Sequence, residues 1–427
     1  MLVRPFVASL LLALTMPVLA QAPRRFPASS EHRGLPTSPL AFAPYHADAD
    51  HVHNRVFRSL WLANQAPTEV AAVIDSADAM QWTAGWVHKK RPGLATDSQW
   101  FGGDGRLLPL EGLAAAAATD MLTQLATLRP GTPAVDDLLA TPELAVLFQH
   151  DLLRVAERLL DTKQNPELVP ALHRAAMAVA LPARTLASLR DPLRRLLASD
   201  VGQRDLAAQV PTTLGGTASE LHEVLRKSTR LFDAEKSLLW SRVFLAHPEG
   251  KTALARLLPA ALQGDETKKG PLVPIGLRAL LVQGIVAFDH DGIAHATPLV
   301  FDVRTQVLVN REPLAATNAT FTHDGIDFGI WQLEREGVRR GEAAQFFRRI
   351  EADDQDLFRD YGTGKHTTYR GQCSLCHRNT DTPEPHLGGF PVLRPHAQAT
   401  FATTGDERLR LAETQAQKLM QRVLAAR

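Results

Sequence analysis

The chain has very few cysteines and almost no excess charge. Cysteine occurs only twice among 427 residues, so one disulfide at most can form within the chain. The 47 lysines and arginines nearly balance 46 aspartates and glutamates, which gives a formal net charge of +1. A charge this close to zero offers no attraction for a polyanion or an anionic membrane surface. We therefore expect no nucleic acid partner.

The apolar run near the start of the chain is too short to predict a membrane span. It extends from Phe6 to Leu14, follows Met-Leu-Val-Arg, and precedes the small residues that end at Ala20. A basic segment, a short apolar segment and a small-residue cleavage site are typical of a secretory signal peptide. We expect residues 1–20 to be removed after Ala20, leaving a periplasmic or otherwise exported protein without a membrane span. The alternative is an uncleaved anchor.

Both cysteines stand in one short motif, Gly-Gln-Cys-Ser-Leu-Cys-His-Arg. Cys373, Cys376 and His377 form a Cys-x-x-Cys-His sequence, which is the attachment motif of haem c. The two thiols would form thioethers with the haem vinyl groups, and His377 would be an axial ligand of the iron. Haem c is attached outside the bacterial cytoplasm, so the signal peptide and the motif support each other. One motif predicts one haem c.

Two other chemistries are open to the same residues. A structural zinc ion normally has four ligands, which Cys373, Cys376 and His377 could provide together with His386 or His396. A thiol-disulfide exchange pair normally lies in a thioredoxin-like βαβ unit, and no such pattern surrounds this motif. Export favours haem over both. A di-haem peroxidase is disfavoured because a second motif is lacking.

The pattern along the chain predicts several regions. Residues 21–45 contain five prolines without apolar periodicity and are interpreted as a flexible leader. Residues 46–270 are interpreted as a helical domain, because start signals at Thr141, Asn165 and Thr217 each precede apolar residues at helical spacing. The last of these predicts a helix through Leu221, Val224, Leu225 and Phe232.

Residues 271–338 are interpreted as a small β subdomain. Leu281 to Phe288 and Val303 to Val309 are rich in β-branched residues, and Phe328 to Trp331 predicts a further strand. Asp291-Gly292 is a turn signal between the first two. These features predict a small antiparallel sheet inserted in the chain.

Helical spacing returns in residues 339–427. Ala343, Phe346, Phe347 and Ile350 fit one helix face before the motif, and a stripe from Leu409 to Val423 fits a last helix. With its helix, motif, loop and helix, this C-terminal fifth resembles the c-type cytochromes, most nearly the class whose motif lies just after a first helix. The expected fold is mainly α: a large N-terminal helical domain, a small antiparallel β insert and a C-terminal helical cytochrome c-like domain.

The sixth iron ligand is left open. In the class that the chain resembles, a methionine precedes the last helix, but here the only methionine after the motif is Met420, within that helix. His386 and His396 follow His377 by 9 and 19 residues. Nine extended residues reach about 30 Å, which covers the roughly 20 Å around a haem, so His386 is possible and His396 is easier. Without any sixth ligand, the iron would be open to small molecules.

A second group of potential ligands lies near the start of the mature chain, in His46-Ala-Asp48-Ala-Asp50-His51-Val-His53. These side chains could bind a divalent metal or approach the haem from another domain. They equally suit an ordinary helix start, with Asp50 as the capping residue.

The sequence thus predicts an exported mono-haem c-type cytochrome that transfers one electron at a time to a redox partner protein. The alternatives are a haem c enzyme or gas or redox sensor with an open sixth position, and a zinc site at the same cluster. The sequence does not decide whether the chain is an enzyme, nor its oligomeric state.

Overall fold

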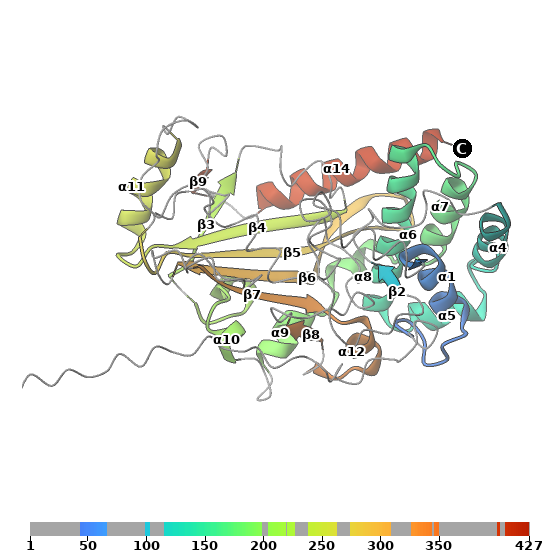
Figure 1. Cartoon of the computed structure of the whole chain (residues 1–427), viewed down its shortest axis with the longest axis horizontal. Helices are drawn as coiled ribbons and strands as arrows, with labels where there is room; N and C mark the ends of the chain where they lie inside the picture. The colour runs from blue at the N-terminus through green and yellow to red at the C-terminus, as the bar shows by residue number, and fades with distance from the viewer. Residues whose placement is uncertain are drawn as a thin grey trace, which may run out of the picture.

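The fold combines a helical end with a long antiparallel sheet (Figure 1). The computed structural model describes residues 43–65, 99–102, 115–198, 204–218, 220–226, 238–262, 274–308, 326–343, 346–349, 399–401 and 406–426. Within these residues, no helix combines the length and the apolar character needed to cross a membrane. The signal peptide predicted for residues 1–20 and most of the leader predicted for residues 21–45 lie outside them. The last three residues of that leader are described, and Ala43 and Tyr45 are buried.

The helical end is formed mainly by the first half of the chain. Helices α6 and α7 pack on each other, α4 packs on α7, and α5 packs on α6. Thr141 and Pro142 precede the rest of α6 as predicted, because proline at the first helical turn loses no hydrogen bond. The helices here are α1 (Val52–Trp61), α4 (Ala115–Ala126), α5 (Pro133–Leu139), α6 (Pro142–Thr162), α7 (Leu168–Ala178), α8 (Ala183–Ala187), α9 (Pro192–Leu197) and α10 (Arg204–Ala207).

A small hairpin and a short 3₁₀ helix complete this part of the chain. The strands β1 (Leu62–Gln65) and β2 (Gln99–Gly102) pair antiparallel, and η3 (Thr212–Leu214) precedes the large sheet.

The large sheet has seven antiparallel strands in the order β8-β7-β6-β5-β4-β3-β9. Its central strands confirm the predicted strands, with Asp291 and Gly292 in the turn between β5 and β6. Gly292 has a φ of 73°, which glycine adopts readily. The strands are β3 (His222–Arg226), β4 (Leu239–Ala246), β5 (Arg278–Phe288), β6 (Ala294–Leu308), β7 (Ile326–Leu333), β8 (Phe347–Arg349) and β9 (Ala399–Phe401).

The prediction of a mainly α fold is wrong. Strands β3 and β4 lie within the region predicted to be a helical domain, and they join strands from the predicted insert and from the C-terminal region in one sheet. The capping signal at Thr217 precedes β3 and not a helix, because residues 222–224 pair with β4. Apolar residues at short spacings suit either structure, and long-range pairing decides between them.

The predicted C-terminal helical domain is also wrong. Phe347, expected in a helix, begins β8, which pairs with β7 at one edge of the sheet. Strand β9 pairs with β3 at the opposite edge. The predicted last helix is confirmed as α14 (Asp406–Ala425), but it packs on β4, β6 and α6. The C-terminal elements are therefore parts of the main sheet and its covering layer.

The two faces of the sheet differ in character. One face carries the large apolar side chains of Trp240, Phe244 and Trp331, which belong to the main hydrophobic core. The indole of Trp240 lies directly over Gly284 of β5, where any larger residue would meet the ring, and its Nε1 donates to the carbonyl oxygen of Thr297 at 2.8 Å. Helices α11 (Lys251–Leu262) and α12 (Arg335–Arg340) follow β4 and β7.

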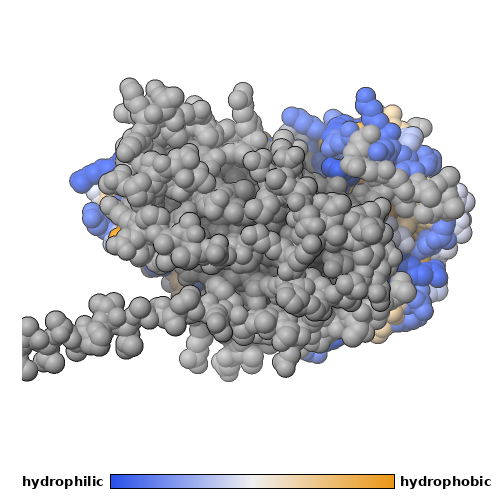
Figure 2. Space-filling model, in the orientation of Figure 1, coloured by the Kyte–Doolittle hydropathy of each residue, from blue (hydrophilic) through white to orange (hydrophobic). Residues whose placement is uncertain are grey.

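The described surface carries few exposed large apolar side chains. They are isolated, and hydrophilic residues dominate the coloured surface of the helical end in Figure 2. Single exposed apolar residues do not mark an interface. Among the described residues these are Ile275, Ile293, Leu411 and Leu424.

Candidate functional site

The residues predicted to hold haem lie almost entirely outside the described part of the chain. Cys373, Cys376, His377, His386 and His396 all fall there. The exception is Met420, which is 2% exposed. Its side chain belongs to the buried stripe of α14 that joins the main core, together with Ala416, Leu419 and Val423. A methionine in such a stripe usually fills core space.

The histidine-rich segment forms a tightly held loop before α1. The amide of Asn54 organises it: its Oδ1 accepts hydrogen bonds from the backbone N–H groups of Tyr45 and His46, at 2.9 and 3.2 Å. Its Nδ2 donates to the carbonyl oxygens of His46 and Asp48, at 2.8 and 2.6 Å. Arg58 adds a bond from its guanidinium to the carbonyl oxygen of Ala49. The backbone that carries His46 and His51 is therefore fixed from inside.

Two histidines of this loop meet a carboxylate from another helix. The rings of His46 and His51 stack with centroids 4.0 Å apart. Asp137 of α5 approaches, with its Oδ2 3.9 Å from Nε2 of His51. One potential ligand atom from each of these three residues lies within 4.8 Å of the others. We call His46, His51 and Asp137 the histidine cluster. The predicted carboxylates Asp48 and Asp50 are not members.

The surroundings of His51 and of the neighbouring His53 favour their neutral imidazoles. Burial lowers the pKa of His51, and the neighbouring His46 lowers it further, while Asp137 and Asp48 oppose the shift. The next histidine along the chain, His53, is 1% exposed, and its ring packs edge-on against those of His51 and Phe148. Burial lowers the pKa of His53 to about 3. Both imidazoles are therefore neutral near pH 7, with one protonated nitrogen and one nitrogen that has a free electron pair.

A buried polar triad lies close to this loop. Asp151 of α6 and Arg335 of α12 form an ion pair, with 2.6 Å between Arg335 Nη2 and Asp151 Oδ1. The Tyr45 hydroxyl donates to Asp151 Oδ2 and accepts from Arg335 Nε at 2.8 Å. All three side chains are at most 3% exposed. Burial raises the pKa of Asp151, and Arg335 counteracts part of that rise. The triad joins three distant segments of the chain.

Comparison with known proteins gives no family for this chain. No family model, curated protein or solved structure matches it. Any functional conclusion therefore depends on the residues themselves.

The second face of the sheet carries a row of polar side chains across four strands. Ser241, Gln283, Asp302 and Gln332 are neighbours in the strand register. Gln283 donates to Ser241 at 3.0 Å, and Gln332 donates to Asp302 at 3.2 Å. Asp302 is fully buried and pairs with Arg304 at 2.7 Å. Such a row is strongly specified by the register, because a one-residue slip would move it into the apolar core.

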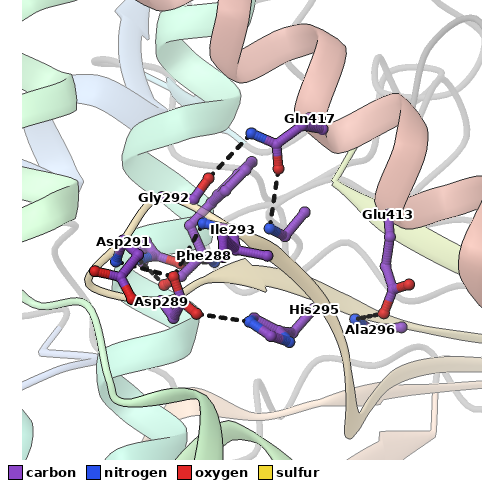
Figure 3. Close-up of polar contacts among 11 residues, drawn as sticks. Phe288, Asp289, Asp291, Gly292, Ile293, His295, Ala296, Glu413 and Gln417 are labelled. Atoms are coloured by element: carbon purple, nitrogen blue, oxygen red, sulfur yellow. Dashed lines mark hydrogen bonds and ion pairs between the residues drawn. The ribbon is translucent and has the colours of Figure 1, made fainter.

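Polar contacts also fasten α14 to the β5–β6 hairpin (Figure 3). Gln417 accepts from the N–H of Ala294 and donates to the carbonyl oxygen of Gly292, both at 3.1 Å, and Glu413 accepts from the N–H of Ala296 at 2.9 Å. In the same hairpin, Asp289 pairs with His295 at 2.8 Å. These contacts fix the C-terminal helix in one position on the hairpin.

Sequence reasoning found the histidines but missed their partner. It grouped His46 and His51 with nearby carboxylates, whereas Asp137 comes from a helix that follows much later in the chain. It also missed the buried triad, since Tyr45, Asp151 and Arg335 share no local pattern. In β6, however, the polar residues Asp302, Arg304 and Gln306 alternate with β-branched residues. Every second residue of a strand lies on the same face, so this alternation could have predicted a polar face.

Proposed function

We propose that the protein is an exported mono-haem c-type cytochrome. The observation that carries the proposal is the Cys373-x-x-Cys376-His377 motif, which contains both cysteines of the chain. The signal peptide predicted at the start of the chain agrees with it, because haem c is attached outside the cytoplasm. The resemblance to c-type cytochromes is now confined to this motif, because the helical domain expected around it is absent from the described fold.

In this proposal the residues of the motif have separate roles. Cys373 and Cys376 hold the haem covalently through two thioether bonds, and His377 binds one axial position of the iron. The other ring nitrogen of His377 needs a hydrogen-bond acceptor, which orients the ring and sets its basicity. When bound, the haem supplies reversible one-electron chemistry, and a redox partner protein receives or delivers the electron.

In the sequence, the motif lies between β8 and β9, the strands at the two edges of the sheet. The chain leaves the sheet at Arg349 on one edge and returns at Ala399 on the other. Six strand spacings of about 4.8 Å place these edges roughly 29 Å apart. A fragment that starts after β7 would lose the partner strands of both β8 and β9. The proposal is therefore tested on the full chain.

The test is covalent haem. We expect the full chain, exported in a host with haem-maturation proteins, to carry a mass increase of one haem that survives denaturation. The double variant Cys373→Ala/Cys376→Ala should lose it, while His290→Ala, at an exposed site on the β5–β6 turn, should keep it. Free thiols that react with an alkylating reagent, or one equivalent of zinc in place of haem, would refute the proposal.

A second candidate is a haem protein with an open or histidine-bound sixth position. The observation that favours it is the burial of Met420 in the apolar stripe of α14, away from solvent. Carbon monoxide separates the cases. A rapid Soret shift of the ferrous protein indicates an open position and a catalytic or sensory role. No shift indicates a sixth ligand, for which His386→Ala and His396→Ala would then be compared by their spectra.

A further inference from the structure

We propose that the histidine cluster is a second metal site, which binds one divalent transition-metal ion through His46, His51 and Asp137. The donor set of two imidazoles and one carboxylate suits Zn²⁺, Cu²⁺ or Ni²⁺ better than Ca²⁺ or Mg²⁺, which prefer oxygen ligands. The three donor atoms already lie within 4.8 Å of one another. This proposal does not depend on haem.

The fold holds the ligands close together before any ion binds. Asn54 fixes the loop of His46 and His51 with four hydrogen bonds, and the two rings lie side by side with centroids 4.0 Å apart. Asp137 stands on α5, which packs on α6 beside the loop. Pre-positioned ligands lose little conformational freedom on binding, and this raises affinity.

The surrounding charges favour a cation. Asp137 and Asp48 are the carboxylates that act on His51, whereas Arg55 and His46 act against positive charge there. Because His46 is an imidazole that becomes a ligand, Arg55 is the one fixed positive charge among these groups. The side chain of Asp137 is 56% exposed and that of His51 is 19% exposed, so an ion can enter from solvent. The cluster therefore suits an exchangeable ion.

Backbone hydrogen bonds to the two imidazole rings limit the affinity of the site for a metal ion. Nδ1 of His46 accepts a hydrogen bond from the N–H of Asp48 at 3.0 Å, and Nδ1 of His51 accepts one from the N–H of His53 at 3.4 Å. A neutral ring in this state carries its proton on Nε2. Coordination through Nε2 moves that proton to Nδ1 and breaks the backbone bond. Coordination through Nδ1 would instead displace the backbone N–H directly, so each ring loses one backbone hydrogen bond whichever nitrogen binds the ion. Each lost bond weakens binding by about fivefold.

The experiment is calorimetric titration of the exported full-length protein with Zn²⁺ and with Cu²⁺, after a chelator has removed exchangeable metal ions. We expect one ion per chain, with Cu²⁺ bound more tightly than Zn²⁺. His51→Ala should reduce affinity at least a hundredfold, and Asp137→Asn about tenfold. His290→Ala, an exposed histidine outside the cluster, should bind as the wild type does.

Two controls keep the proposal falsifiable. The Cys373→Ala/Cys376→Ala chain should still bind one ion, because these thiols are not ligands of this site. Asp137→Asn changes an exposed side chain and should leave the circular dichroism spectrum unchanged. The proposal is overturned if the wild type and His51→Ala bind the ion equally, if the Cys373→Ala/Cys376→Ala chain binds no ion, or if the histidine ¹⁵N spectra stay unchanged at saturating Zn²⁺.

Discussion

Removing the negative charge of Asp151 is predicted to destabilise the fold strongly. Asp151→Asn preserves the shape of the side chain but removes the negative charge that pairs with the fully buried guanidinium of Arg335. Breaking a buried pair from one side costs about 3–5 kcal/mol, whereas an exposed pair contributes about 0–1 kcal/mol. The Tyr45 hydroxyl also loses its anionic acceptor. We expect Asp151→Asn to lower the free energy of unfolding by about 3–5 kcal/mol.

The assay is urea unfolding at pH 7, followed by far-ultraviolet circular dichroism and compared through midpoints at constant slope. Asp161→Asn is the matched control, because Asp161 pairs with Arg422 at 2.5 Å while both side chains are about half exposed. That change should cost less than about 1 kcal/mol. Replacing both buried partners, as Asp151→Leu/Arg335→Met, should cost less than Asp151→Asn alone. The reasoning fails if Asp151→Asn behaves like the control or if the double variant is the least stable.

Three further predictions concern other parts of the fold. Burial raises the pKa of Asp191 from 3.8 to about 6, so its contribution to stability is greatest below pH 4 and is lost as the pH rises through 6. Asp191→Asn should therefore gain up to about 3 kcal/mol relative to the wild type between pH 4 and pH 7 in urea titrations, and a constant difference would contradict this. Gly284→Ala should lower the free energy of unfolding by about 1–3 kcal/mol, and with it the urea midpoint, because its Cβ would meet the indole of Trp240; an unchanged midpoint would refute the packing. A fragment of residues 339–427 should show no cooperative thermal unfolding, since the partners of β8, β9 and α14 lie outside it, and a cooperative transition would show an independent domain.

The strands that were predicted from sequence are those whose signals are local and strong. Residues 281–288 are mostly apolar and include three β-branched residues, and they form the last eight residues of β5, almost all of them buried. Strand β3 has only five residues and follows a good helix-start signal, so its sequence favoured the wrong structure. Only pairing with β4 and β9, far away in the chain, makes it a strand. Tertiary pairing overrides local propensity where the local signal is short.

The candidate sites show the same limit. The sequence placed His46 and His51 in one ligand-rich segment, because close spacing is visible locally. It could not place Asp137 beside them, since that contact depends on how α5 returns to the loop. The triad of Tyr45, Asp151 and Arg335 was even harder to predict from the sequence. Its members come from three distant segments of the chain, and no local pattern around any of them indicates the contact.

The order of the strands also bears on the proposed haem unit. Strands β8 and β9 have three residues each and form the two edges of the sheet, and short edge strands limit unwanted pairing with other chains. Nine or so extended residues would cross the roughly 29 Å between these edges, whereas residues 350–398 are available. The chain therefore has length to spare for the motif and for both candidate histidine ligands. Because this connection begins after β8 and ends before β9, the proposed haem would be attached to the segment that joins the two edge strands in sequence.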